Sequence, residues 1–319
     1  MSARIGIFPG IRVGCNISPV PTYCLSMTRR LLRTLVLAIG LLAPSFLAFP
    51  QDAKENPATG TVAIAGTGDY VFFEVTVNAH KLWAVLDTAA DYTYFDGETA
   101  KSAGVQGAGD VTIPMEVGGL SVRLPAKIRD LRKLLFPNQQ AALQGGRVML
   151  ILGHNVVEQF LTVVDYRKKK VAFIRAKHPI GDEEFKTLTA PYVGDATECR
   201  TLNLDIVDNH PFITGNVKGR SERFHFCVDT GGPGDVNFLT IVGKEIFNVE
   251  TEVTVEIAAD GHTFPGVRMV KCPPCYVDQN SQKMQKRDNK LYVGLLGHAF
   301  LHPYTVVFDY SRKKLLLAK

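Results

Sequence analysis

The sequence lacks the motifs that mark several large enzyme classes. It has no glycine-rich phosphate loop, no dinucleotide-binding glycine pattern, no Gly-x-Ser-x-Gly turn around a nucleophilic serine and no His-Glu-x-x-His zinc helix. These absences argue against a nucleotide-dependent enzyme, a serine hydrolase with that turn and a zinc peptidase of that type. Any chemistry of this chain has to come from other residues.

Excess charge of one sign is confined to the beginning of the sequence. The formal net charge is +5, but five arginines and no acidic residue precede Ala48. Without these five, 31 basic residues face 31 acidic ones, so the remainder is neutral. A neutral body gives no electrostatic basis for binding nucleic acid or an anionic membrane, and we expect no nucleic-acid partner.

The first part of the chain has the pattern of a targeting signal. A basic start at residues 27–30 is followed by the apolar run 35–43 and a break at Pro44. The run is too short to span a bilayer comfortably, so we interpret residues 27–50 as a signal peptide and expect an exported protein, periplasmic or secreted. An uncleaved segment that tethers the chain to a membrane is the alternative. Residues 1–26 show no clear periodicity and are assigned to no domain.

Cysteine is scarce beyond this leader and forms no zinc pattern. Four cysteines follow it, namely Cys199, Cys227, Cys272 and Cys275. The Cys272-Pro-Pro-Cys275 pair has the spacing of some redox and zinc sites, but no second pair or histidine pair accompanies it. We therefore expect no metal site, and interpret the pair as a local disulfide that closes a loop or as free thiols. Cys227 lies in an apolar segment and is expected in the core.

An internal repeat organises the rest of the chain. One block begins Ile151-Leu-Gly-His and continues to Val163-Val-Asp-Tyr. It returns 144 residues later as Leu295-Leu-Gly-His and Val307-Phe-Asp-Tyr. Repetition of this kind at a fixed spacing is typical of a duplicated structural unit.

A second matched block lies upstream of each copy. Ala84-Val-Leu-Asp-Thr-Ala returns 142 residues later as Phe226-Cys-Val-Asp-Thr-Gly. Because two ordered blocks recur at nearly one offset, we infer a duplication. We expect an N-terminal lobe at residues 60–175, a linker at 176–199 and a C-terminal lobe at 200–319.

Strand signals dominate both lobes. Residues 70–77 are rich in β-branched and aromatic residues, and residues 112–124 have the pattern of two short strands around a Gly-Gly turn. Residues 250–267 repeat this pattern around another glycine turn. Helix signals are short and weak, as at residues 130–135. The sequence therefore predicts an all-β fold, mainly antiparallel, with a few short helices.

Two aspartates occupy corresponding places in the repeat. Asp87 and Asp229 each follow an apolar segment that should form a buried strand, where an isolated carboxylate is costly. If the lobes meet at a pseudo-two-fold axis, the two carboxyls can share one proton. The ionised one can then take a proton from water while the other donates to a carbonyl oxygen, which hydrolyses an amide. The small and hydroxyl residues expected to support these loops are Thr88, Ala89, Thr230 and Gly231.

This pattern resembles the Asp-Thr-Gly signature of the pepsin and retropepsin clan of aspartic peptidases. The triplet occurs twice, and each copy is followed by an apolar-apolar-Gly segment and an Asp-Tyr hairpin, as in that clan. The compact lobes look more like the bacterial retropepsin-like branch. The resemblance implies a bilobal acid-protease-like fold, a polypeptide substrate, no cofactor, and a monomer with internal pseudo-symmetry.

The resemblance also implies supporting elements around the two aspartates. Residues 151–153 and 295–297 should pack behind the aspartate loops. Hairpin flaps should cover the cleft, and we place them near residues 111–124 and 253–267. No individual substrate-binding residue follows from the sequence.

Some positions depart from the clan pattern. Ala89 replaces a glycine and adds a methyl to a tight loop, where overpacking costs about 1–3 kcal/mol. His154 and His298 replace a usual aspartate, and we interpret them as surface variants without a chemical role. Asp91 either alters the local field or is a solvated turn residue.

Two further conclusions concern the repeated turns and the alternatives to an enzyme. Asp165 and Asp309 each begin a charged turn and are interpreted as structural. Because of Ala89, a catalytically weak or inactive peptide-binding protein of the same fold is the alternative function. A dimer that completes its aspartate pair between chains is disfavoured, since one chain carries both halves.

Overall fold

The computed structural model describes most of the chain beyond the leader, and the described residues are 59–66, 70–134, 147–176, 179–232, 236–272 and 276–319. They belong to one compact unit, Lys54–Lys319. The predicted signal peptide and Cys275 lie outside the described residues. Within the described ranges, no helix has the length and apolar content needed to cross a membrane.

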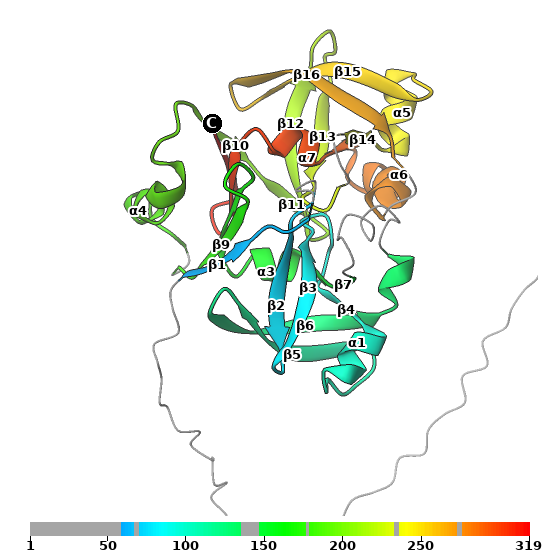
Figure 1. The fold of residues 1–319 in the computed structure, drawn as a ribbon. Coiled ribbons are helices and arrows are strands. Elements are labelled where there is room, and N and C mark those ends of the chain that lie inside the picture. Colours follow the sequence, from blue (N-terminus) through cyan, green and yellow to red (C-terminus); the bar gives the residue numbers. More distant parts are fainter. Residues whose placement is uncertain (1–58, 67–69, 135–146, 177–178, 233–235, 273–275) are drawn as a thin grey trace, which may run out of the picture. The chain divides into compact units, whose positions relative to one another are not determined.

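The N-terminal lobe is a closed six-stranded barrel. Its strands are β2 (Phe72–Val77), β3 (His80–Leu86), β4 (Tyr94–Asp96), β5 (Asp110–Val117), β6 (Leu120–Arg129) and β7 (Val148–Leu152). They are hydrogen-bonded in the order β2-β3-β7-β4-β6-β5, and pairing of β2 with β5 closes the ring (Figure 1). Burial alternates along β5, as the side-chain period of a strand with one interior face requires.

The C-terminal lobe closes its strands in the same way. Its strands are β11 (Asp205–Val207), β12 (His210–Val217), β13 (Arg223–Val228), β14 (Asn237–Leu239), β15 (Glu252–Ala259), β16 (His262–Lys271) and β17 (Leu291–Leu296). The order is β12-β13-β17-β14-β16-β15, and β12 also pairs with β15. The short β11 extends this barrel beside β12. The mainly β prediction is confirmed.

The two barrels agree in detail as well as in order. In each barrel, the strand that leads to the repeated aspartate, Asp87 or Asp229, pairs in parallel with the strand of the Leu-Gly block. The pairing of β3 with β7 is irregular between Trp83 and Ala84, and that of β13 with β17 between His225 and Phe226, 142 residues later. A shared irregularity at the repeat spacing fits an internal duplication.

A six-stranded antiparallel sheet joins the lobes. Its order is β1 (Thr59–Ala63), β9 (Lys170–Ile174), β8 (Leu161–Asp165), β18 (Thr305–Asp309), β19 (Lys314–Ala318) and β10 (Cys199–Asn203). The central pair, β8 with β18, comes from the two copies of the repeat, with Thr305 opposite Asp165. The strand after each Leu-Gly block therefore supplies half of the connection between lobes.

Helices are short and lie outside the barrels' hydrogen-bonded rings. They are α1 (Gly97–Ser102), the 3-10 helix η1 (Leu131–Lys133), α3 (His154–Val157), α4 (Asp182–Val193), α5 (Ile241–Phe247), α6 (Tyr276–Asp288) and α7 (His298–Leu301). The helices α3 and α7 begin directly after Gly153 and Gly297, so each Leu-Gly strand turns at once into a helix.

The linker contains a helix that the sequence analysis did not predict. The segment expected as a linker, residues 176–199, contains α4, which occupies half of it. Its apolar residues Phe185, Leu188 and Tyr192 pack on the outer face of the six-stranded sheet, beside Leu161 and others. Tertiary burial of this apolar stripe outweighs the weak local helix preference.

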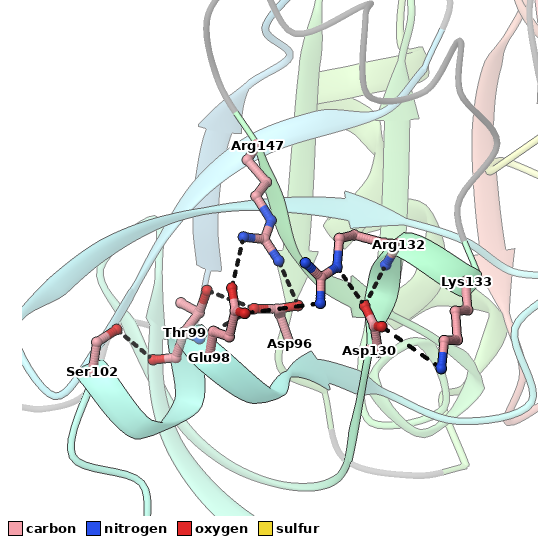
Figure 2. Close-up of polar contacts among 8 residues, drawn as sticks. All are labelled: Asp96, Glu98, Thr99, Ser102, Asp130, Arg132, Lys133 and Arg147. Atoms are coloured by element: carbon pink, nitrogen blue, oxygen red, sulfur yellow. Dashed lines mark hydrogen bonds and ion pairs between the residues drawn. The ribbon is translucent and has the colours of Figure 1, made fainter.

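An ion-pair network fixes the end of β4 in the first barrel. Asp96 is buried, caps α1 by accepting from the Thr99 N–H at 3.1 Å, and pairs with Arg147 at 2.8 Å. Figure 2 shows Arg147 between Asp96 and Glu98. Arg132 pairs with Asp130 at 2.8 Å and approaches Glu98 at 3.8 Å. The network ties α1, η1 and the start of β7 together, which holds β4 in place.

The two hairpins expected to be flaps are instead anchored by their turns. A Cβ added at Gly118, in the β5–β6 turn, would lie 2.4 Å from the Thr61 amide nitrogen of β1. In the β15–β16 turn, the Asp260 carboxylate accepts from the backbone and side-chain nitrogens of Asn203, both at 2.7 Å. Both turns lie on edge strands of the six-stranded sheet, so the flap placement is not retained. The contacts also shield these edges from pairing with another chain.

The close approach at Gly118 makes a prediction for stability. Gly118 has φ +56°, and Gly104 has φ +71° with open space around it. Both Gly118→Ala and Gly104→Ala incur left-handed backbone strain of about 1–2 kcal/mol. Gly118→Ala should lose about 1–3 kcal/mol more, because its methyl meets backbone. Urea unfolding of both variants tests this, and equal losses would contradict the docking of the turn on β1.

Candidate active site

The two aspartates lie at equivalent ends of the parallel strand pairs. Asp87 follows β3, and its backbone N–H donates to the Leu152 carbonyl at 3.0 Å. Asp229 follows β13, and its N–H donates to the Leu296 carbonyl at 2.9 Å. Each Leu-Gly block therefore backs an aspartate loop, as the resemblance to aspartic peptidases implied.

The threonines after the aspartates bind each other's loops across the junction. The Thr88 hydroxyl donates to the Val228 carbonyl at 2.6 Å, and the Thr230 hydroxyl donates to the Leu86 carbonyl at 2.7 Å. Each hydroxyl also accepts from the other threonine's N–H, at 3.0 and 3.1 Å. Both side chains are buried, and the four bonds satisfy the N–H groups of Thr88 and Thr230 and one backbone carbonyl of each loop.

These bonds bring the two carboxyls together. Asp87 and Asp229 are hydrogen-bonded through their side chains. Each carboxylate also accepts from the N–H two residues ahead, Ala89 for Asp87 at 3.0 Å and Gly231 for Asp229 at 2.9 Å. Asp229 is 6% exposed and Asp87 is partly buried. Two carboxyls in such contact cannot both ionise easily, so a shared proton is the favourable state.

Burial dominates the acidity of Asp87. It raises the pKa of this carboxyl to about 6, while N–H donors at Ala89 and Ala90 and the bond to Asp229 act in the opposite direction. The negative charge of Asp91 adds a smaller increase to the pKa of Asp87. The predicted field effect of Asp91 is thus present, and one member of the pair titrates in mild acid.

The glycine and alanine after the two threonines are not equivalent. A Cβ at Gly231 would lie 2.4 Å from Cγ of Asp87, so only glycine fits against that carboxyl. Ala89 is accommodated in the other loop, where its methyl packs beside an apolar cluster of the C-terminal lobe that includes Phe212 and Phe238. The extra methyl therefore has apolar neighbours, and it makes the two loops chemically different.

Asp91 is more than a solvated turn residue. Its Oδ1 accepts from the Tyr94 hydroxyl at 2.5 Å, and its carbonyl accepts from the side chain of Asn209 at 3.2 Å. Asn209 belongs to the other lobe, so these bonds hold the segment after the first aspartate loop at the junction.

The interpretation of His154 as a surface residue is wrong. His154 is 7% exposed, and its ring packs against Tyr310 of the other lobe with centroids 5.1 Å apart. His298 is partly buried and contacts Tyr166 at 5.2 Å between centroids, in an edge-to-face arrangement. Sequence position alone could not reveal this, because the partner tyrosines come from the opposite half of the repeat.

The repeated aspartates after the central strands serve as turn residues, as predicted. Asp165 is buried, and its carboxylate accepts from the Lys168 N–H at 2.9 Å. Asp309 is buried and accepts from the Arg312 N–H at 3.1 Å and from the Ser311 hydroxyl at 2.7 Å. Cys227 is fully buried, in agreement with its assignment to the core. No group of three potential metal ligands occurs among the described residues.

Two supporting residues escaped the sequence analysis. Asn237 accepts from the Gly297 N–H at 3.0 Å, and Thr93 accepts from the Gly153 N–H at 3.4 Å. Both fix a Leu-Gly turn to the neighbouring short strand of the barrel. They lie 144 residues apart, so full alignment of the two repeat copies would have paired them despite their different side chains.

The threonine bonds predict a large and specific loss of stability. Thr88→Val keeps the shape of the side chain but leaves a buried N–H and a buried carbonyl unpaired, each costing about 1–3 kcal/mol. Thr112→Val, on the exposed face of β5, is the control and should change the free energy of unfolding by less than about 0.5 kcal/mol. Chemical denaturation measures both, and similar values for the two variants would refute the role of the junction bonds.

The raised pKa of Asp87 predicts a pH-dependent effect of its removal. The native state holds this proton more tightly than the unfolded chain, so Asp87 weakens stability as the pH rises from about 4 to 6. Asp87→Asn cannot ionise and escapes this loss. The melting temperature of the variant should therefore rise relative to wild type between pH 4 and pH 7. Parallel pH curves for the two proteins would show that Asp87 has an ordinary acidity.

Comparison of the sequence with models of known protein families and with curated proteins finds no match to either. The function of the chain therefore has to be inferred from the geometry of the site. Two hydrogen-bonded carboxyls lie at the junction of two like barrels, held there by threonines of both.

Proposed function

We propose that this chain is an aspartic endopeptidase with a retropepsin-like bilobal fold, in which Asp87 and Asp229 activate water to hydrolyse peptide bonds. The observation that carries the proposal is the hydrogen bond between the two carboxyls, one from each barrel. The reciprocal Thr88 and Thr230 bonds support it, because they give the pair a fixed geometry.

The shared proton provides both an acid and a base. The ionised carboxylate takes a proton from a water molecule, whose oxygen attacks the carbonyl carbon of the scissile bond. The protonated carboxyl donates its proton to the carbonyl oxygen, so no strongly charged oxyanion has to form. Collapse of the tetrahedral species returns a proton to the leaving nitrogen and breaks the carbon–nitrogen bond. The cycle needs neither a covalent intermediate nor a cofactor.

The proposed substrate is a polypeptide in an extended conformation. Such a chain can form strand-like hydrogen bonds along a cleft between two β lobes. One chain supplies both carboxyls, so the active species should be a monomer. An exported location, with a leader at residues 27–50, completes the proposal.

Substitution of each aspartate tests the mechanism. Asp87→Asn and Asp229→Asn should each reduce hydrolysis of a dye-quenched unfolded protein by at least about 100-fold at mildly acid pH, because each removes one half of the acid–base pair. Asp110→Asn, at an exposed position of the first barrel, is the matched control and should keep wild-type activity. Circular dichroism checks that all three variants fold. A fully active Asp87→Asn or Asp229→Asn would exclude this mechanism.

A peptide-binding protein without turnover is the second candidate, and Ala89 is the observation that favours it. The methyl makes the first loop bulkier than its glycine counterpart in the second loop. This candidate predicts that wild type and Ala89→Gly both bind unfolded peptide and cleave none. If wild-type protein that elutes at the monomer mass in gel filtration cleaves the peptide, this candidate is excluded and the peptidase is supported.

A further inference from the structure

Two aromatic contacts cross the junction between the lobes. His154, the first residue of α3, packs against Tyr310, which follows β18 of the other lobe. His298, the first residue of α7, packs against Tyr166, which follows β8. Each lobe thus contributes one histidine and one tyrosine, and each pair links a helix start to the central sheet.

His154 is directly connected to the first aspartate loop. Its backbone N–H donates to the Ala90 carbonyl at 3.0 Å, three residues after Asp87. The residues just before it, Leu152 and Gly153, bind Asp87 and Thr93. A displacement of His154 would therefore be transmitted to the loop that holds the first carboxyl.

The His154 ring lies in an environment suited to its neutral form. Its Nε2 lies 3.2 Å from Oε2 of Glu158, to which a neutral ring can donate. Its Nδ1 is buried and has no hydrogen-bond partner among the described residues. The buried Tyr310 hydroxyl likewise has none there. Protonation would add a donor at Nδ1 where the described surroundings offer no acceptor, which is costly in a buried site.

Two charged groups act on His154, and they come from different parts of the first lobe. Glu158 at the end of α3 and Asp91 after the first aspartate loop both favour the protonated ring, whereas burial opposes it and has the larger effect. The pKa of His154 is consequently lowered. Tyr310 stays neutral because burial raises its pKa well above the usual value, and Cys227 and Glu158 add smaller increases.

Solvent reaches this junction from one side. A cavity of about 530 Å3 is lined by His154, Glu158, Pro179, Ile206, Tyr310 and Ser311. It touches both lobes and the linker, so protons and water can approach the pair without unfolding of either barrel.

We propose that the His154–Tyr310 contact is an acid-sensitive joint between the lobes, in which protonation of His154 disrupts its packing on Tyr310 and loosens the first aspartate loop. The equivalent contact does not share this property. The His298 ring is less buried and stacks on His302 at 5.0 Å, so a positive charge there remains closer to solvent.

The sign of the effect follows from proton linkage. The unfolded chain takes up a proton at this histidine near pH 6.5, before the native state does. The stabilising contribution of neutral His154 is therefore complete above this pH and decreases as the pH falls below it. Asp87 has the opposite dependence, so a comparison of variants at His154 is needed to separate the two.

Thermal unfolding of the full-length protein tests the joint. Between pH 7 and pH 5, wild type should lose about 3 °C more in melting temperature than His154→Gln, whose neutral amide can still donate to Glu158. His298→Gln, the pseudo-symmetric control, should follow wild type. Parallel curves for wild type and His154→Gln, or an equal effect of His298→Gln, would overturn the proposal.

A titration of the unaltered protein provides a second test that does not depend on a variant's ability to fold. NMR signals of the His154 ring should titrate below pH 6.5, and the Tyr310 ring signals should change with the same midpoint. A His154 midpoint at or above 6.5, or Tyr310 signals unaffected by the titration, would refute the joint. Neither test requires peptidase activity, so its outcome is independent of the proposed function.

Discussion

The reciprocal hydrogen bonds between Thr88 and Thr230 are the constraint on which the rest of the site depends. Each hydroxyl satisfies a carbonyl and an N–H of the opposite loop, in a place without solvent. Without them, four backbone groups would be buried and unpaired. The free-energy cost of burying unpaired N–H and carbonyl groups would then destabilise the junction. Because the bonds fix the two loops against each other, the carboxyls before them share a hydrogen bond and one of them acquires a raised pKa.

The molecule repeats its architecture but not its chemistry. Both barrels have the same strand order, and both Leu-Gly strands back an aspartate loop. The differences lie at the junction. Ala89 in the first copy of the repeat corresponds to Gly231 in the second, and His154 is more buried than its counterpart His298. Two like barrels can therefore present two similar carboxyls in unequal surroundings, which is the condition for giving them different protonation states.

Several features were missed or misplaced because distant residues decide them. The hairpins near residues 118 and 260 have ordinary turn sequences, and only their docking on β1 and β10 excludes them as flaps. The linker helix α4 forms because the six-stranded sheet offers an apolar face. His154 is buried by Tyr310, a residue more than 150 positions away. Local sequence carries no record of such partners, so these features could not be predicted from it.

The sequence by itself determined the repeat, the mainly β character of both halves and the matching positions of Asp87 and Asp229 in that repeat, because period and spacing are properties of the chain. Tertiary structure decided that the two aspartates meet, that Thr88 and Thr230 join the loops, and that an aromatic contact connects the lobes. These depend on contacts between residues some 140 to 156 positions apart. Such contacts exist only once two separately closed barrels are brought together by one shared sheet.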